Sequence, residues 1–544
     1  MPYQVDWPNA LDDIVMLSFA GPMRRQFTLR PRRAGRWRFL VRPIAPSDLR
    51  GVSVFEAEFD TVTQLPRLFD WKPPQGCERV RDWAWSAIRL SQDLPNINLA
   101  PEGYWPDYER DQPIDLPLSE RSSIIDQITT LSPLQGRFKL FELEDKPHSF
   151  AMWSCHQPFV GESDEPAQIV EGTQAILEWY ARRIEEEDVD IIYALGDTAY
   201  SDGCKATNFV DEYYSKTGSL NSAEERRALR NAYQDMYRHY WSFDDFQAVQ
   251  RRRPHIYIWD DHELRDGSGS EAEDFRGDNS TIREIATDVA RAYILDQGPR
   301  VKRPHGDRSE DAHKAYRYGS VATFIFDGRS SRAYHQKNGR VISDQQMADF
   351  ERFCYQVAHD ESIRYLCMGT AVPFINLKGF VERIGSEEPK RLTDLEGVTI
   401  RDDLRDSWHS PGNQGQLQDL ITILRKTLDK NEKCIAVNLS GDIHMANAFS
   451  FQPPGFRQAC YQITSSALTN RKHLDSWVAP FFEIGAIAHS DILGDITRIW
   501  TNERNPNFLT VRERNGLLDI HLNVFNAKTG KADPTLDKAF TIGL

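Results

Sequence analysis

Short apolar runs, each followed by a cluster of polar, metal-capable residues, recur from Phe150 onward, and this recurrence constrains the fold more than any other sequence feature. The runs are Phe150–Trp153, Ile191–Leu195, Ile256–Trp259, Val321–Phe326, Arg364–Met368 and Cys434–Leu439. Strands buried on both faces have such continuous apolar sequences, and open α/β sheets bind ligands at the carboxyl ends of their strands. The pattern predicts buried strands with a polar site at their carboxyl ends.

Segments with helical spacing of apolar residues lie between these runs. One spans Ala167–Glu186, a second follows a capping residue at Ser343, and a third carries apolar residues from Leu417 to Leu428. The alternation of strand, polar cluster and helix is typical of a layered α/β fold. We therefore predict the α/β class.

The first 145 or so residues differ in residue pattern and composition from the rest of the chain. Residues 26–41 contain short pieces in which polar and apolar residues alternate, and residues 94–119 are rich in proline and acids. We expect an N-terminal β-rich domain and connector over residues 1–145, and a catalytic domain over residues 146–544. The pair Asn515-Gly516 lies between alternating runs, which predicts a β-hairpin at the end of the catalytic domain.

Charge and hydrophobicity limit the partners and the location of the protein. The chain has 544 residues and a formal net charge of −15, so no long-range attraction to nucleic acid or an anionic membrane is expected. In the first 25 residues acids precede the apolar stretch and basic residues follow it, unlike a secretory signal, and no apolar run approaches the roughly 20 residues that span a bilayer. We expect a cytoplasmic protein. Its seven scattered cysteines do not form a disulfide framework.

The first segment with chemistry is Gly196-Asp197-Thr198-Ala199-Tyr200. A carboxylate directly after a strand, preceded by a glycine that permits a sharp turn, is placed to bridge two cations, and the tyrosine is placed to bind one of them as a phenolate. The alternative is that Asp197 only caps a following helix. This segment alone leaves both interpretations open.

The second segment is Trp259-Asp260-Asp261-His262-Glu263, at the end of a strand-like run. Packing gives no reason for three acids and a histidine within five positions. A solvated turn is the alternative, but the preceding apolar run favours burial, and buried charge requires partners or a metal. The segment therefore favours a functional site.

The third segment is Ser440-Gly441-Asp442-Ile443-His444. Asp442 and His444 are two residues apart, so on an extended chain both side chains point to one side and suit a metal ion. A lone histidine beside a strand is more often structural. Three such segments, each after a buried strand, indicate one metal site.

Together these segments resemble the calcineurin-like metallophosphoesterases, whose Gly-Asp-x-x, Gly-Asn-His-Asp/Glu and Gly-His-x-His segments follow in the same order. The Ser-Cys, Gly-Asp-x-x-Tyr, Trp-Asp-Asp-His-Glu, Asp-x-Arg and Ser-Gly-Asp-x-His segments are similar to those of the PhoD-like alkaline phosphatases. The similarity covers about residues 150 to 450. It implies a four-layer α/β/β/α sandwich, here preceded by the N-terminal β-rich domain.

The resemblance implies six metal ligands and two kinds of metal. Asp197 would bridge the ions, Asp261 and Asp442 would hold a divalent ion, and the ligands of Fe(III) would be Cys155, Tyr200 and His444. Asp261 stands where the superfamily has asparagine, and Asp442 where it has histidine. Carboxylate donors favour Ca²⁺, then Mg²⁺ or Mn²⁺, over Zn²⁺ at the second position.

The resemblance also implies catalytic roles. His262 would protonate the leaving oxygen or stabilise the transferring phosphoryl group, and Glu263 would orient it. Arg329 and Arg332, in the segment that resembles Asp-x-Arg, would bind phosphate oxygens, or else form a surface ion pair. The asparagines usual in the family after the Asp-Asp-His-Glu segment are absent from residues 264–269, which puts a third metal position in doubt.

The function implied is hydrolysis of phosphate monoesters, phosphate diesters or both by a metal-activated water. Two alternatives remain, a protein that binds phospho-ligands on a phosphatase scaffold and a metal-dependent nuclease. Retention of every proposed ligand argues against the first, and the acidic balance disfavours the second. The expected partner is a phosphate ester, with neither membrane nor nucleic acid.

Overall fold

The protein was analysed as a computed structural model, and its described residues fall into several ranges. They are residues 5–45, 51–59, 65–90, 132, 134–141, 148–162, 165–214, 218–301, 311–333, 339–375, 394–395, 398–399, 406, 408, 410, 412–469 and 489–543. The expected connector, residues 94–119, and the expected domain boundary near residue 145 lie outside these ranges.

A ten-stranded mixed sheet forms one half of the core. Its strands, in spatial order, are β25 (Lys531–Ala532), β24 (Leu517–Asn526), β23 (Asn507–Arg514), β8 (Ser149–Trp153), β11 (Ile191–Leu195), β12 (His255–Ile258), β1 (Ile14–Gly21), β2 (Arg24–Arg30) and β5 (Arg67–Trp71), and β26 (Lys538–Ile542) also pairs with β24. Strands β8, β11, β12 and β1 run parallel. Their carboxyl ends therefore meet at one edge.

An eight-stranded sheet forms the other half. Its strands, in spatial order, are β13 (Lys314–Tyr318), β14 (Val321–Ile325), β15 (Tyr365–Thr370), β18 (Ile435–Ser440), β20 (Cys460–Thr464), β19 (Ala446–Gln452), β22 (Gly494–Glu503) and β21 (His489–Ser490). Strands β14, β15, β18 and β20 are parallel. All six apolar runs predicted from the sequence thus form strands, with boundaries shifted by a residue or two.

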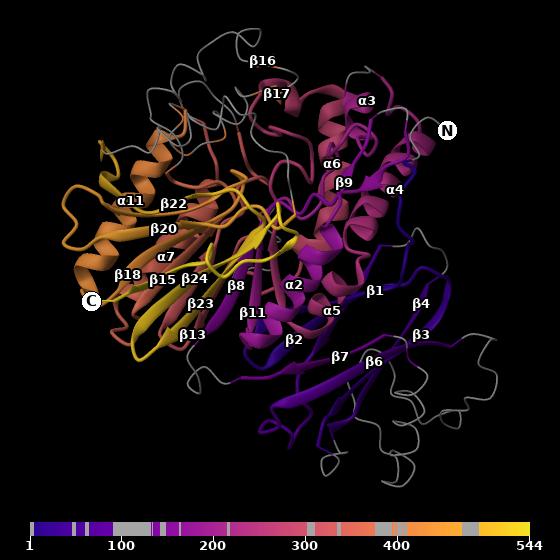
Figure 1. Cartoon of the computed structure of the whole chain (residues 1–544), viewed down its shortest axis with the longest axis horizontal. Helices are drawn as coiled ribbons and strands as arrows, with labels where there is room; N and C mark the ends of the chain where they lie inside the picture. The colour runs from indigo at the N-terminus through magenta and orange to yellow at the C-terminus, as the bar shows by residue number, and fades with distance from the viewer. Residues whose placement is uncertain are drawn as a thin grey trace.

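The two sheets pack face to face and helices cover both outer faces, as Figure 1 shows. Side chains of β8, β11 and β12 meet those of β14, β15 and β18 in a continuous apolar layer. The helices over the ten-stranded sheet are α2 (Thr173–Glu186), α4 (Ala223–Tyr240), α5 (Asp244–Arg252) and α6 (Gly277–Ala290), and those over the other sheet are α7 (Asp344–Ala358) and α11 (Gln414–Lys430). The predicted α/β/β/α sandwich is confirmed.

The sequence pattern locates the helices with one error of length. Ser343 caps α7, because its hydroxyl oxygen accepts a hydrogen bond from the backbone N–H of Gln346. The helix expected over Ala167–Glu186 begins only at Thr173. Ile169 pairs instead with Phe159 in a two-stranded ribbon, β9 (Phe159–Val160) and β10 (Gln168–Ile169), and Gly172 then turns with φ of 78°.

The N-terminal region contributes to two sheets. Strands β1, β2 and β5 complete the ten-stranded sheet, whereas β4 (Ser53–Phe59), β3 (Gly35–Pro43), β6 (Asp82–Leu90) and β7 (Leu134–Lys139) form a separate four-stranded sheet. Aromatic residues of this small sheet, such as Phe39 and Trp85, pack on Phe27 of β2. The described part of the chain is β-rich here, and the division into residues 1–145 and 146–544 stays a prediction.

The C-terminal hairpin forms where the sequence predicts it. Asn515 and Gly516 both have positive φ, 54° and 77°, as a two-residue hairpin turn between β23 and β24 requires.

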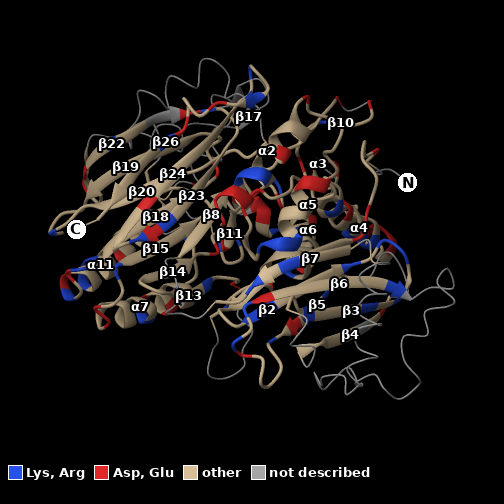
Figure 2. Ribbon diagram, turned by 60° about the horizontal axis from the view of Figure 1, so that its bottom comes forward, with Lys and Arg blue, Asp and Glu red and all other residues tan. Residues whose placement is uncertain are grey.

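In Figure 2 the strands of the two large sheets are mostly free of charged residues, which gather on helices and loops. All seven cysteines are buried and free. Among the described residues, no helix is long and apolar enough to cross a membrane.

Candidate metal centre

The carboxyl ends of strands from both sheets meet at the candidate centre. Cys155 follows β8, Asp197 follows β11, Asp260 to His262 follow β12, and Asp442 follows β18. Gly441 makes this approach possible: a Cβ atom there would lie 2.4 Å from the Cβ atom of Ser154 and 2.9 Å from the carbonyl oxygen of Leu195. The side-chain-free residue therefore lets the loop after β18 lie against the loops of the other sheet.

Cys155, Tyr200 and His444 converge on Asp197. The Asp197 Oδ2 atom is 3.3 Å from the Cys155 Sγ atom and 3.2 Å from the Tyr200 hydroxyl oxygen, which lies 3.5 Å from the His444 Nε2 atom. Donor atoms of Cys155, Asp197 and His444 all lie within 4.8 Å of one another. The structure thus brings these four predicted ligands together, and ligand atoms of Asp261 and Asp442 each lie within 4.8 Å of one of Asp197.

Four candidate ligands have backbone conformations that non-glycine residues rarely adopt. The φ angles are 56° at Cys155, 53° at Asp197, 70° at Asp442 and 51° at His444. Only a few per cent of non-glycine residues have positive φ, and such strain clusters at functional sites. Four of the six described non-glycine residues with positive φ are candidate ligands. The strained backbone conformations are therefore concentrated at the candidate metal site.

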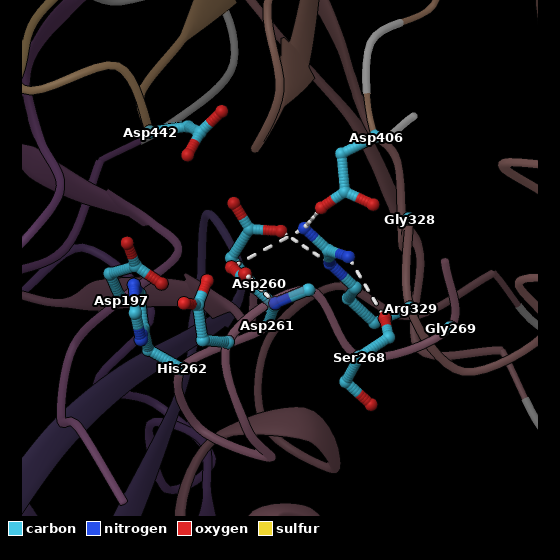
Figure 3. Close-up of polar contacts among 12 residues, drawn as sticks. Asp197, Asp260, Asp261, His262, Ser268, Gly269, Gly328, Arg329, Asp406 and Asp442 are labelled. Atoms are coloured by element: carbon cyan, nitrogen blue, oxygen red, sulfur yellow. Dashed lines mark hydrogen bonds and ion pairs between the residues drawn. The ribbon is translucent and has the colours of Figure 1, made fainter. Parts of the chain in front are cut away.

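A second cluster consists of the carboxylates of Asp197, Asp260 and Asp442, whose oxygens lie within 4.8 Å of one another (Figure 3). Asp197 and Asp260 are only 1% exposed, and the Asp197 Oδ1 and Asp260 Oδ2 atoms have no hydrogen-bond partner in the described structure. A buried carboxylate oxygen without a partner is costly, and a bound cation removes that cost. These residues fit a metal ion.

Burial and mutual repulsion shift the pKa values of the same carboxylates. Burial raises the pKa of Asp197 and of Asp442 well above the usual range, and neighbouring carboxylates raise both further. Burial likewise raises the pKa of Asp260 to about 6. Burial acts in the same direction on Asp261, but Arg329 and His262 outweigh it and lower the pKa of Asp261 to about 2. A bound cation would favour the charged form of each carboxylate.

His262 lies beside these carboxylates and is held by Asp202. The His262 Nδ1 atom is 2.7 Å from the Asp202 Oδ1 atom, and the ring packs on Tyr200 with centroids 4.3 Å apart. Its side chain remains 22% exposed, whereas Asp197 and Asp261 are buried. Burial lowers its pKa, but Asp202, Asp261 and Asp197 outweigh this effect and raise the pKa well above the usual value. His262 therefore lies at the solvent side of the cluster, where the neighbouring carboxylates favour its protonated form.

Comparison with known protein families decides which superfamily branch this arrangement represents. The family model of the PhoD-like phosphatases matches residues 150–476, more than half of the chain. The chain belongs to the PhoD-like phosphatase family. Membership supports phosphoester hydrolysis as its activity.

Solved structures agree with the family in fold. The structure of PhoD has a TM-score of 0.57 and 13% sequence identity, and the match covers 98% of this chain and 90% of PhoD. The chain is also similar to purple acid phosphatase PPD1 from yellow lupin (Lupinus luteus), with a TM-score of 0.49 and 11% identity over 98% of this chain and 75% of that one. The comparison with curated proteins gave no match.

In this PhoD-like phosphatase Glu263 contacts backbone rather than His262. Its carboxylate accepts hydrogen bonds from the backbone N–H groups of Asp197 (3.1 Å), Thr198 (2.5 Å) and Asp260 (2.8 Å). The expectation that Glu263 orients His262 is therefore corrected, since Asp202 makes that contact. Glu263 instead ties the loop after β11 to the loop after β12, which keeps the candidate ligands Asp197 and Asp261 in place.

Arg329 and Arg332 contact protein groups in this structure. Arg329 is buried, and its nitrogens bond Asp260, Ser268 and Asp406, while Arg332 bonds the backbone oxygen of Asp406. The alternative of a surface ion pair does not apply, because both side chains are buried. Contact of these arginines with phosphate stays a prediction, although the described contacts direct Arg329 toward carboxylates.

Three acids at the centre were missed by the sequence reasoning. Asp202 lies two residues after Tyr200, in the same loop, and this proximity was a usable signal. Asp260 belongs to the Asp-Asp-His-Glu segment, but only the second aspartate was assigned. Asp406 is distant from every motif in sequence and had no signal, because only the fold brings it to Arg329.

Proposed function

We propose that this PhoD-like phosphatase hydrolyses phosphate monoesters, diesters or both at the cluster of Cys155, Asp197, Tyr200, Asp261, Asp442 and His444, with metal ions bound there. The observation that carries the proposal is the pair of buried, unpartnered carboxylate oxygens on Asp197 and Asp260. No hydrogen-bond partner reaches either oxygen among the described residues. A decayed phosphatase scaffold that only binds phospho-ligands would have no need of such a costly arrangement.

The donor types suggest different metals at the two sides of Asp197. Cys155, Tyr200 and His444 supply sulfur, phenolate oxygen and imidazole nitrogen, which suit Fe(III). Asp260, Asp261 and Asp442 supply only carboxylate oxygen, the donor preferred by Ca²⁺, Mg²⁺ and Mn²⁺. Asp197 lies next to both sets and would bridge them. We propose Fe(III) with a divalent ion, Ca²⁺ first, and Asp260 as an additional carboxylate facing the divalent position.

When bound, the metal ions would lower the pKa of water and neutralise phosphoryl charge. The protein's own residues supply the rest. His262, partly exposed, is placed to donate a proton from Nε2 to the leaving oxygen, while Asp202 fixes the ring through Nδ1. Glu263 holds the two ligand loops in register. With these roles assigned, His262 is the residue that donates the proton to the leaving oxygen.

The test is hydrolysis by metal-stripped and reconstituted protein. Chelated protein would be assayed with p-nitrophenyl phosphate, bis-p-nitrophenyl phosphate and single-stranded DNA before and after addition of iron with Ca²⁺ or Mn²⁺. We expect hydrolysis of one or both small esters only after reconstitution, and none of the DNA. Cleavage of DNA alone would support the nuclease, and no hydrolysis by metal-loaded protein would overturn the proposal in favour of a binding protein.

A further inference from the structure

Arg329 lies behind the metal-facing carboxylates, with every guanidinium nitrogen engaged. The Nε atom donates to the Asp260 Oδ1 atom at 2.5 Å, the Nη1 atom to the backbone oxygen of Ser268 at 3.0 Å, and the Nη2 atom to the Asp406 Oδ2 atom at 2.5 Å. The Nη2 atom is also 3.4 Å from the Asp261 Oδ1 atom. Figure 3 shows the guanidinium group between Asp406 and the pair Asp260 and Asp261.

Asp406 is the residue that fixes Arg329 from the opposite side. Besides Arg329, the Asp406 carboxylate accepts a hydrogen bond from the hydroxyl of Ser270 and lies 3.1 Å from the Arg332 Nη2 atom, which also bonds its backbone oxygen at 2.7 Å. The residue is 4% exposed. It therefore joins the loop after β12, which contains Ser268 and Ser270, to the loop after β14, which contains Arg329 and Arg332.

We propose that Asp406 is a positioning residue for the metal centre: it holds Arg329, and Arg329 holds one oxygen of Asp260 so that the other faces the metal cluster. The inference rests on the proposed function. Asp260 Oδ1 is bonded by Arg329 and Asp260 Oδ2 has no partner, and an Asp260 oxygen lies within 4.8 Å of oxygens of Asp197 and Asp442. A carboxylate held in this way has one oxygen left for a cation.

Electrostatics explains why a second anion is needed behind the arginine. Without Asp406, Arg329 would be free to move toward Asp261 and the other carboxylates of the cluster, and its charge would compete with the metal ion for the same oxygens. With Asp406 on its far side, the arginine is drawn away from the cluster and its position is fixed by three groups. Partners of metal ligands typically change metal affinity or activity by about 10–100-fold when removed.

The experiment measures metal affinity directly in Asp406→Asn, which keeps the size of the side chain and removes its charge. Calorimetric titration of metal-free protein with Mn²⁺ is expected to show affinity about 10–100-fold weaker than in the parent protein. With iron also supplied, saturating Mn²⁺ should restore kcat, with KM for bis-p-nitrophenyl phosphate unchanged. Mn²⁺ affinity equal to that of the parent, or a raised KM at saturating Mn²⁺, would overturn the proposal, because the second result places the Asp406–Arg329 pair on the substrate.

Two further variants separate positioning from general stability. Asp349→Asn is the matched control, since Asp349 is a fully buried ion-paired aspartate whose partners, His313 and Arg352, are bonded to none of the candidate metal ligands among the described residues. Its Mn²⁺ affinity should equal that of the parent, and a matching loss there would overturn the proposal. If Asp406→Asn does not fold, Arg329→Lys keeps the charge but replaces the rigid planar fork that reaches Asp260, Ser268 and Asp406 with a single compact ammonium group. It should weaken Mn²⁺ binding to a similar extent, and unchanged affinity would equally overturn the proposal.

The parent protein distinguishes failure of this inference from failure of the proposed function. A parent that binds metal and hydrolyses esters, with Asp406→Asn indistinguishable from it, refutes only the role of Asp406. A parent that neither binds metal nor hydrolyses esters refutes the proposed function and this inference with it.

Discussion

Asp197 and Asp327 occupy equivalent places in the two sheets, yet their surroundings are opposite. Each lies within two residues of the end of a parallel strand, β11 or β14, and each is buried. The Asp327 carboxylate accepts hydrogen bonds from the side chains of Trp259 and Ser330 and from the backbone N–H groups of Ala312, Arg329 and Ser330. Asp197 Oδ1 has no such partner.

Their pKa shifts express the same contrast. Burial raises the pKa of both carboxyls, but the hydrogen bonds from Ser330, Ala312 and Trp259 outweigh burial at Asp327 and lower its pKa below the usual value. At Asp197 burial dominates and the pKa rises well above it. Hydrogen bonds within the protein stabilise the charged form of Asp327. A bound cation would stabilise the charged form of Asp197. In this pair, the aspartate with an unpaired oxygen, Asp197, is the candidate metal ligand, and Asp327, whose oxygens are fully hydrogen-bonded, has a structural role.

The largest expected effect is therefore a divergence between Asp197→Asn and Asp327→Asn. Loss of Asp197 should reduce metal content and bring ester hydrolysis to background, beyond the roughly 10–100-fold loss typical of a mere partner of a ligand. Asp327→Asn should keep its metal and instead lower the free energy of unfolding, by about 1–3 kcal/mol for each buried donor left unpaired. Metal analysis and denaturant unfolding of both variants check this, and full metal occupancy with near-normal turnover in Asp197→Asn would refute its assignment.

His262→Ala tests whether the histidine beside Asp197 belongs to the ligands. Its Nδ1 atom is taken by Asp202, which leaves Nε2 for the substrate. We expect kcat to fall by about 10²–10⁴-fold, as for a lost general acid, with metal content unchanged. The loss should shrink for substrates with good leaving groups. Stoichiometric loss of metal would show His262 to be a ligand.

Tyr200→Phe and Cys155→Ser sharpen the contrast between the iron side and the carboxylate side of Asp197. A phenolate on ferric iron gives a charge-transfer band in the visible, so the protein should be coloured and Tyr200→Phe should lose that band. Cys155→Ser should shift the spectrum, and the double variant should be nearly colourless. Identical visible spectra from iron-loaded parent and single variants would mean that neither residue binds iron.

The smallest expected effect concerns His521, a partly exposed histidine that is paired with Asp537 and Glu187. Hydrogen bonds with Asp537 and Glu187 raise the pKa of His521 to about 9. Since the pKa is raised on folding, its contribution to stability is complete below about pH 6.5 and is lost as the pH rises through about 9. His521→Gln should lower Tm at pH 6 by at most about 2–4 °C and leave it unchanged at pH 10. His489→Gln, at an exposed pair with Asp495, is the control.

The fold was predictable because its signals are local. The six central strands are continuous apolar runs in the sequence. Ser343 predicts the start of α7, and Asn515-Gly516 predicts the hairpin between β23 and β24. The start of α2 was not predictable from spacing, because Ile169 suits a helix face and a strand equally, and only pairing with Phe159 decides between them.

The site was predictable to the extent that its residues follow strand ends. Asp197, Asp261, Asp442 and His444 lie in such segments, so their convergence followed from the parallel order of the strands. The role of Glu263 was not predictable, because its sequence position beside His262 gives no information on which way the side chain points. The contact of Asp406 with Arg329 joins residues 77 positions apart and required the fold itself.

The most direct test of the metal centre is anomalous diffraction from crystals of catalytically active protein, recorded on both sides of the iron absorption edge. The predicted result is one iron peak within bonding distance of Cys155, Asp197, Tyr200 and His444, with a second, non-iron ion between Asp197 and the carboxylates of Asp260, Asp261 and Asp442. Active crystals with no metal at Asp197 would contradict the account.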